Sequence, residues 1–413
     1  MTDFTRTARR TTLILFLAQS LASAGFIAAA TLNSILGAKL GGGSAWAGVP
    51  SAVYLLGGAF AASAWGYLMD VIGRRNGIAL GLVIGVAGTG LVVVSIDHGW
   101  LAGFLWGMLL MGVANAAIVL GRFAAAEVNP PERRGAAIST VVLGGTFGSI
   151  FGPLIVGPAG TLVKSLGMDE LSGAYAASLL LFGLAALLVF VALRPDPRDV
   201  GREISRLYPH ANPDGEARPI LSILRQPQAF AALMAMVLGQ VVMVAVMVIT
   251  SLHMKDHQHM LVDISTVISA HTFGMYAFSV ISGRLADKWG RAQVILTGSI
   301  VLLLACVTAP LSPDVLPLAF SLFLLGLGWN FCFVGGSTLL SDQLSPAERA
   351  RTQGANDLLV GLASALGSLT AGITFAALGY ALVTAVGAGL CLIPIILSIQ
   401  LLRNRNISHR SDV

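Results

Sequence analysis

The chain has 413 residues, of which 55% are hydrophobic and only 11% are charged, and its net charge at neutral pH is +5. Ordinary soluble domains carry about 25% charged residues, so this composition excludes a soluble globular domain. The sequence also has no phosphate-binding loop and no nucleophile with a supporting base, which argues against an enzyme and against a bound cofactor.

Apolar stretches recur about every 30 residues, and each is close to the roughly 20 residues that a helix needs to cross a bilayer. Helices are expected because backbone groups in lipid must find their partners within the segment, and the short alternating segments of a β-barrel are absent. We therefore predict an all-α polytopic membrane protein with twelve transmembrane helices, at residues 12–35, 46–69, 77–95, 101–125, 137–162, 172–193, 226–252, 262–285, 293–311, 315–341, 353–377 and 379–402.

Basic residues gather on one side of this arrangement. Of the 25 lysines and arginines, only Lys39, Lys164 and Lys255 fall on the other side, and Arg122 lies within the fourth span. The positive-inside rule then places both termini in the cytoplasm of a bacterial cell, with the protein in the inner membrane. Because topology accounts for the positive charge, no nucleic-acid partner is expected.

The spans fall into two sets of six. Between the sixth and seventh spans lies the longest polar stretch, with five prolines and both signs of charge. We predict an N-terminal half over residues 1–193, a cytoplasmic linker over 194–225, a C-terminal half over 226–402 and a cytoplasmic tail over 403–413.

The two halves repeat a short motif. After the second span the chain reads GYLMDVIGRR, and after the eighth it reads GRLADKWGRA. An offset of 217 pairs Gly66 with Gly283, Asp70 with Asp287, Gly73 with Gly290, and Arg74 with Arg291. A second repeat, at an offset of 215, pairs Asn115 with Asn330 and Glu127 with Asp342. Two related halves predict a pseudo-two-fold axis along the membrane normal.

The motif G-x-L-x-D-x-x-G-R-R resembles the signature of the major facilitator superfamily, and the resemblance covers the whole chain. It implies a secondary transporter of a small organic solute that works by alternating access, and we expect a monomer. It also implies that the eight paired motif residues form a gate on the cytoplasmic side. Tight turns with basic anchors would explain the glycines and arginines, but not an acid at the same place in both copies. Gly66 and Gly283 are expected to allow close helix packing.

A glycine-rich run in the fifth span bears on the direction of transport. Gly148, Gly152, Pro153 and Gly157 resemble the pattern G-x-x-x-G-P-x-x-G-G of the family's drug–proton antiporters, although Val156 replaces the first glycine of the final pair. The glycines predict close helix packing and the proline predicts a bend. Generic helix packing also produces glycine-rich runs of this kind. The resemblance to the antiporter pattern favours proton-coupled export.

Two observations leave other functions open. Met108 stands where proton-coupled members carry an arginine in the fourth span, and no acidic residue lies deep in the first six spans. The missing carboxylate argues against a dedicated organic-cation pump. Metabolite uptake with protons stays open, as does a membrane sensor or assembly factor on the same scaffold.

Candidate residues for proton or substrate contact lie within the spans. His271, near the predicted bilayer midplane, either changes charge during transport or is a neutral ring bonded to a neighbouring helix. The remaining candidates for contact with a proton or the solute are Gln19, Asn115, Gln240, Asp263, Trp329 and Asn330. For Asn115 and Asn330 the alternative is a hydrogen bond between helices. The aromatic run WNFCF at 329–333 suits a cavity for a flat or amphiphilic molecule, and the alternative is that these rings face lipid, as aromatic residues in membrane helices more often do.

Histidines also cluster in the stretch HMKDHQHM, at 253–260, which we predict as an external loop. His253 and His257 can share a helical face, whereas His259 approaches them only if the chain turns. No second cluster completes a ligand set, so we expect a solvated loop and no metal site. Transport of a metal or metal chelate is the alternative.

Overall fold

In a computed structural model, residues 2–130, 133–207 and 218–411 are described, and within these ranges the regular elements are helices, without strands. Eleven helices there are long and apolar enough to cross a membrane. The last, Thr352–Asn404, is bent at Leu378 and Gly379, between the predicted eleventh and twelfth spans. The all-α polytopic membrane fold is confirmed, and the bend separates two arms that the sequence predicts as separate spans.

The chain forms two compact units. Unit 1 contains Met1–Gly43, Val49–Ala211 and Met260–Ser265, and unit 2 contains Ser44–Gly48, Asn212–His259 and Thr266–Val413. The predicted linker 194–225 and tail 403–413 are described only in part, since 208–217 and 412–413 lie outside the described ranges. The bounds of the four predicted segments stay predictions.

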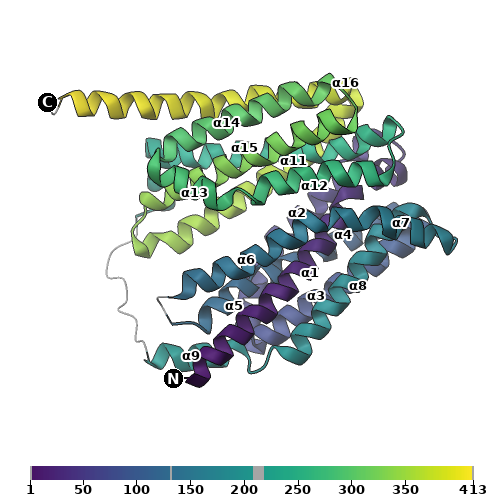
Figure 1. Cartoon of the computed structure of the whole chain (residues 1–413), viewed down its shortest axis with the longest axis horizontal. Helices are drawn as coiled ribbons and strands as arrows, with labels where there is room; N and C mark the ends of the chain where they lie inside the picture. Colours follow the sequence, from purple (N-terminus) through teal and green to yellow (C-terminus); the bar gives the residue numbers. More distant parts are fainter. Residues whose placement is uncertain (1, 131–132, 208–217, 412–413) are drawn as a thin grey trace. The chain divides into compact units, whose positions relative to one another are not determined.

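Unit 1 is a helical bundle (Figure 1). Its helices are α1 (Thr2–Gly41), α2 (Val49–Ile72), α3 (Arg74–Asp97), α4 (Leu101–Val119), α5 (Gly121–Glu127), α6 (Arg134–Phe151), α7 (Val156–Ser165), α8 (Gly173–Ala192) and α9 (Pro197–Leu207). Helix α1 packs against α6 and α8, and α4 packs against α2 and α3. The core between them includes the fully buried rings of Phe104, Tyr175 and Phe182.

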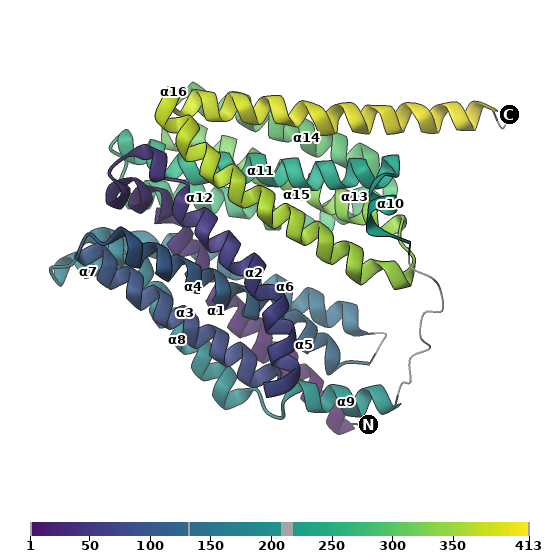
Figure 2. The same cartoon turned by 180° about the vertical axis from the view of Figure 1, so that it is seen from behind.

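Unit 2 is a second bundle, seen from behind in Figure 2. Its helices are α10 (Ile220–Leu224), α11 (Pro227–Asp256), α12 (Leu261–Tyr276, whose first turn belongs to unit 1), α13 (Ser279–Lys288), α14 (Arg291–Thr308), α15 (Val315–Asp342) and α16 (Pro346–Ser411). Helix α11 packs against α15 and α16, and α14 packs against the same two helices.

Glycines bring α6 against α1. A Cβ atom at Gly148 would overlap the backbone oxygen of Ser20, and one at Gly152 would lie 2.5 Å from the backbone oxygen of Ala24. Pro153 then begins a 3₁₀ turn that separates α6 from α7, because proline has no N–H to continue the helical bonding. At Gly157, a Cβ would lie 2.5 Å from the Val262 side chain. The fifth span is therefore a closely packed, interrupted helix.

The sequence predicts close helix packing at Gly66 and Gly283, but no residue that the structure describes packs closely against either glycine. No heavy atom lies within 4 Å of the Cβ that alanine would place at either position. Each glycine is on a half-exposed face of its helix near the motif turn, so neither is needed to admit a neighbour there.

Candidate functional site

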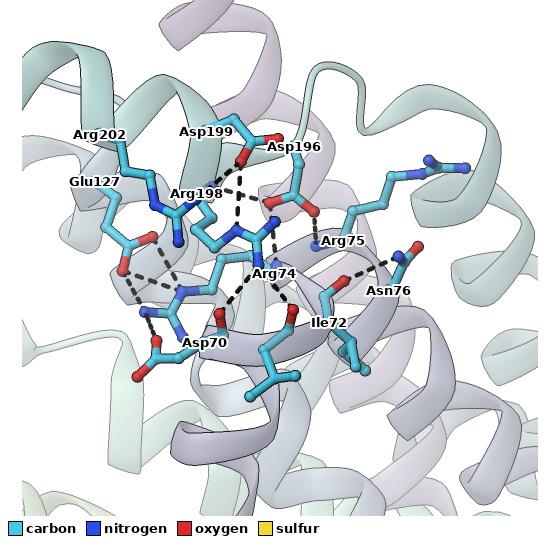
Figure 3. A network of polar contacts seen from close by, with 11 residues as sticks. Asp70, Ile72, Arg74, Arg75, Asn76, Glu127, Asp196, Arg198, Asp199 and Arg202 are labelled. Carbon is cyan, nitrogen blue, oxygen red and sulfur yellow. Dashed lines mark hydrogen bonds and ion pairs between the residues drawn. The ribbon is translucent and has the colours of Figure 1, made fainter.

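The first copy of the motif forms the turn between α2 and α3 (Figure 3). Gly73 has φ 93° and ψ 158°, a combination that essentially only glycine adopts. The carboxylate of Asp196, just before α9, accepts hydrogen bonds from the backbone N–H groups of Arg74 and Arg75, both at 3.1 Å. Asp196 therefore satisfies two of the N–H groups that a helix start leaves without partners. A Cβ at Gly73 would overlap this carboxylate.

Arg74 connects three helix ends. Its guanidinium donates to the Glu127 carboxylate, with distances of 2.7 Å from Nη2 and 3.1 Å from Nε to Oε1. It also forms a 2.9 Å ion pair with Asp70, one turn earlier in the chain. Glu127 ends α5, so the pairs join α2, α3 and α5 at one point. The spacing of Asp70 and Arg74 is that of an ion pair one helical turn apart, whereas no spacing in the sequence indicates the pair with Glu127.

The beginning of the predicted linker is part of this network. Arg198 on α9 donates from Nη1 to the backbone oxygens of Asp70 and Val71, at 3.0 and 2.9 Å. These carbonyls belong to the last turn of α2, where helical partners are missing. On its other side, α9 places Val200 and Ile204 in an apolar cluster with Ala8 and Val128. Residues 196–207 therefore clamp the α2–α3 turn.

The second copy repeats the ion pairs. Arg291 pairs with Asp287 at 3.3 Å and with Asp342 at 2.9 Å. Gly290 has φ 107° and ψ 152°, the conformation of its counterpart Gly73. The internal repeat thus extends from sequence to side-chain contacts. The eight residues predicted as a gate form two ion-paired turns, and their role in gating stays a prediction.

The far end of the linker is attached to unit 2. Arg218 donates to the Glu348 carboxylate from Nε at 2.7 Å, from Nη2 at 2.9 Å and from its backbone N at 3.0 Å. Glu348 is the third residue of α16 and accepts from the Ser345 backbone N at 2.9 Å, the arrangement of a capping box with proline at the first helical position. The Arg218 guanidinium holds the pKa of Glu348 well below its usual range.

A low pH should therefore reduce the stability of unit 2. The stabilisation from the Arg218–Glu348 pair is complete above the ordinary glutamate pKa of about 4.3 and is lost as pH falls through the lower pKa of the folded protein. We expect the Tm of the purified protein to drop more steeply from pH 5 to pH 3 than that of Glu348→Gln, which has no carboxylate there to protonate. Asp199→Asn, an exposed acid on α9, is the control and should keep the wild-type slope. Equal slopes for wild type and Glu348→Gln would contradict this assignment.

The polar candidates of the spans differ in their surroundings. In unit 2, Trp329 donates from Nε1 to Oε1 of Gln240 at 2.6 Å. Its ring stacks on Phe333, with centroids 5.1 Å apart, and meets Tyr276 edge-on at 6.2 Å. All four side chains are half-buried. This group, which we call the Trp329 cluster, joins α11, α12 and α15, and its aromatic and amide groups are partly exposed.

Two of the polar candidates in unit 1 are Gln19 and Asn115. Gln19 donates to Ser23 on its own helix at 3.0 Å, and Asn115 is half-buried on α4. The Gln19 side chain is half-buried as well.

Asn330 bonds helices together. Its amide donates to the Met275 backbone oxygen at 2.7 Å and to Ser279 Oγ at 2.9 Å, and its oxygen accepts from Ser282. These contacts hold the break between α12 and α13 against α15. The amide is thereby occupied, so the interhelical role, one of the two alternatives, describes this residue.

His271 is fully buried where α12 crosses α15. Its Nδ1 lies 3.0 Å from the Leu322 backbone oxygen, so Nδ1 carries the proton, while Nε2 has no hydrogen-bond partner among the residues described. The crossing is tight, because a Cβ at Gly326 would overlap the His271 backbone oxygen. This geometry is that of a neutral ring bonded to the neighbouring helix. Asp263 accepts from the Met260 backbone N at 3.1 Å and so caps the start of α12.

The rings of His253 and His257 meet edge-on with centroids 4.4 Å apart, so these two histidines share a helical face, as the sequence predicts. The His253 ring stacks on Tyr380, with centroids 4.3 Å apart, His257 Nδ1 lies 2.8 Å from the His253 backbone oxygen, and His259 Nε2 lies 2.9 Å from the Pro313 backbone oxygen. Across the described ranges, no group of three histidine, cysteine or acidic residues is placed to hold a metal ion. The solvated loop is shorter than predicted, because α11 continues to Asp256 and carries a half-buried His253.

A sequence profile described as the Major Facilitator Superfamily matches residues 15–262 and 232–411. The chain belongs to this superfamily. It is therefore a membrane transport protein for a small-molecule solute and not an enzyme.

Several proteins are similar to this chain over most of its length. The MFS-type transporter YdeG of Bacillus subtilis is 32% identical, covering 94% of this chain and 91% of its own length. The riboflavin transporter RfnT of Brucella anthropi is 30% identical, covering 87% of each chain. The multi-drug resistance efflux pump PmrA of Streptococcus pneumoniae is 26% identical, covering 81% and 80%. Among solved structures, the human organic anion transporter MFSD10 shares the fold with a TM-score of 0.63 at 18% identity, over 95% of this chain and 99% of the other.

Proposed function

We propose that this superfamily member exports a small organic solute with a planar ring system, in exchange for protons, across a bacterial inner membrane with both termini in the cytoplasm. The observation that carries the proposal is the Trp329 cluster, in which Trp329 and Phe333 present stacked rings beside the Gln240 amide. Aromatic faces bind planar rings by stacking, and an amide supplies the polar contact that orients them.

The comparisons support the same solute class and direction. One relative at 30% identity is named for riboflavin, whose ring system is planar, and another is named as an efflux pump. The interrupted glycine face of α6 on α1 is consistent with the antiporter pattern in the sequence. The absence of acidic residues deep in the first six spans favours a neutral or anionic solute over an organic cation.

The experiment is a flux measurement in proteoliposomes with two planar fluorescent probes, riboflavin and the cation ethidium. We expect saturable flux of the neutral flavin at a rate well above that of ethidium. Ethidium flux without flavin flux would contradict the proposed solute class. No flux of either probe, or of any other planar solute in a wider screen, would favour a sensor or assembly factor.

His271→Asn separates two roles of the histidine. Asparagine can keep an N–H donor for the Leu322 backbone oxygen but cannot take up a proton. Because the wild-type ring is buried and bonded to that oxygen, we expect His271→Asn to keep its Tm and the pH dependence of transport, and His271→Ala to lose stability by about 1 kcal/mol or more. If His271→Asn abolished the pH dependence at unchanged Tm, the ring would be the proton carrier.

A further inference from the structure

A pocket of about 610 Å³ opens beside the clamped α2–α3 turn of unit 1. Its charged lining consists of Arg74, Arg134, Arg198, Arg202, Arg206 and Glu127. Among the residues that the structure describes, the lining therefore has five guanidinium groups and one carboxylate. The guanidinium groups come from α3, α6 and α9, so the pocket collects positive charge from three helices.

The arginines are not all neutralised by the network around them. Glu127 is bound by Arg74, and Arg198 donates to the α2 carbonyls. The Arg202 side chain is 64% exposed, and its one ion pair with a described residue is a long contact of 3.9 Å to Asp199. Arg206 is exposed and forms no ion pair with a residue that the structure describes. Two guanidinium groups on one side of the pocket thus retain their capacity to bind an anion.

The size and position of the pocket indicate which class of anion it can bind. Guanidinium groups bind phosphate oxygens in bidentate geometry, and the volume accommodates a phosphate ester with its substituents. The pocket lies at the ends of membrane-crossing helices, next to Phe123, whose ring is 45% exposed on α5. An apolar surface beside a cluster of arginines at the ends of such helices matches an amphiphile with an anionic head.

We propose that this pocket binds the phosphate headgroup of an anionic membrane phospholipid. A headgroup in the pocket would contact α6 and α9 together. It would thereby add to the contacts that hold residues 196–207 against the α2–α3 turn. The site is separate from the Trp329 cluster and does not depend on the identity of the transported solute.

The test is titration of the detergent-purified full chain with dioleoylphosphatidylglycerol, followed by native mass spectrometry of the first bound lipid. Dioleoylphosphatidylcholine and inorganic phosphate serve as the other two probes. An arginine near an anionic lipid surface contributes about fivefold in affinity. We therefore expect Arg202→Gln/Arg206→Gln to weaken phosphatidylglycerol binding by roughly twentyfold and to leave phosphatidylcholine binding unchanged.

Arg284→Gln/Lys288→Gln is the matched control, because it removes two exposed positive charges of unit 2 outside this pocket. It should bind phosphatidylglycerol as the wild type does. An equal loss in both double variants would overturn the pocket assignment in favour of general attraction. Competition by millimolar inorganic phosphate, with no preference for the lipid, would overturn the lipid assignment and leave a site for free phosphate groups. Full binding by Arg202→Gln/Arg206→Gln would overturn both.

Discussion

Gly73→Ala is expected to lower the Tm of the protein by about 5 °C or more and to reduce transport at least severalfold. Alanine at φ 93° and ψ 158° costs about 1–3 kcal/mol in backbone strain. Its Cβ would also displace the Asp196 carboxylate from the backbone N–H groups of Arg74 and Arg75, and loss of such a cap costs about 0.5–2 kcal/mol. Thermal unfolding and flux in proteoliposomes measure the two effects.

Gly379→Ala provides the matched control. Gly379 has φ 76° and ψ −168°, and nothing lies within 4 Å of the Cβ position. The control therefore carries backbone strain without a displaced carboxylate, and should lose less stability than Gly73→Ala. Asp196→Ala should cost little when added to Gly73→Ala, because the cap is already lost. Equal losses for the two glycine variants, or full additivity with Asp196→Ala, would contradict the clamp.

Trp329→Ala is expected to reduce flux of the planar solute by about tenfold or more, equivalent to about 1.4 kcal/mol. The substitution removes the ring that stacks on Phe333 and the Nε1–H that orients Gln240. Trp329→Phe keeps the stacked surface and should lose only part of the flux. The initial rate at low solute concentration is the measurement.

Trp106→Ala is the control for this prediction, since Trp106 is 60% exposed on α4 of unit 1 and lies outside the Trp329 cluster. Its flux should stay within about twofold of wild type. A loss in Trp106→Ala as large as in Trp329→Ala, or no loss in Trp329→Ala, would remove the cluster from the solute path.

The sequence predicts the elements that follow from periodicity and repetition. Span positions depend on long apolar runs, and the pairs of Arg74 with Asp70 and of Arg291 with Asp287 depend on a one-turn spacing, so both are readable locally. The bend at Gly379 is likewise visible as a glycine between two apolar arms.

Contacts between distant segments are not readable in this way. Asp196 lies 122 residues beyond Arg74, in a stretch whose composition is that of a connector. One feature of the sequence does indicate that this stretch is docked. Val200 and Ile204 are at helical spacing in PRDVGREISRL, as in an amphipathic helix that packs on a neighbour. The partner of His271 is a backbone oxygen, which any residue supplies, so no sequence pattern could identify it.

Solute–proton exchange determines the side of the membrane on which a neutral solute accumulates. Proteoliposomes containing the purified protein would be given an imposed pH gradient, and the fluorescent planar solute would be measured in the lumen. Exchange moves the solute against the proton flux whichever way the protein is inserted. We expect accumulation when the lumen is acidic and release on addition of a protonophore. Accumulation in an alkaline lumen, or flux indifferent to the gradient, would contradict solute–proton exchange.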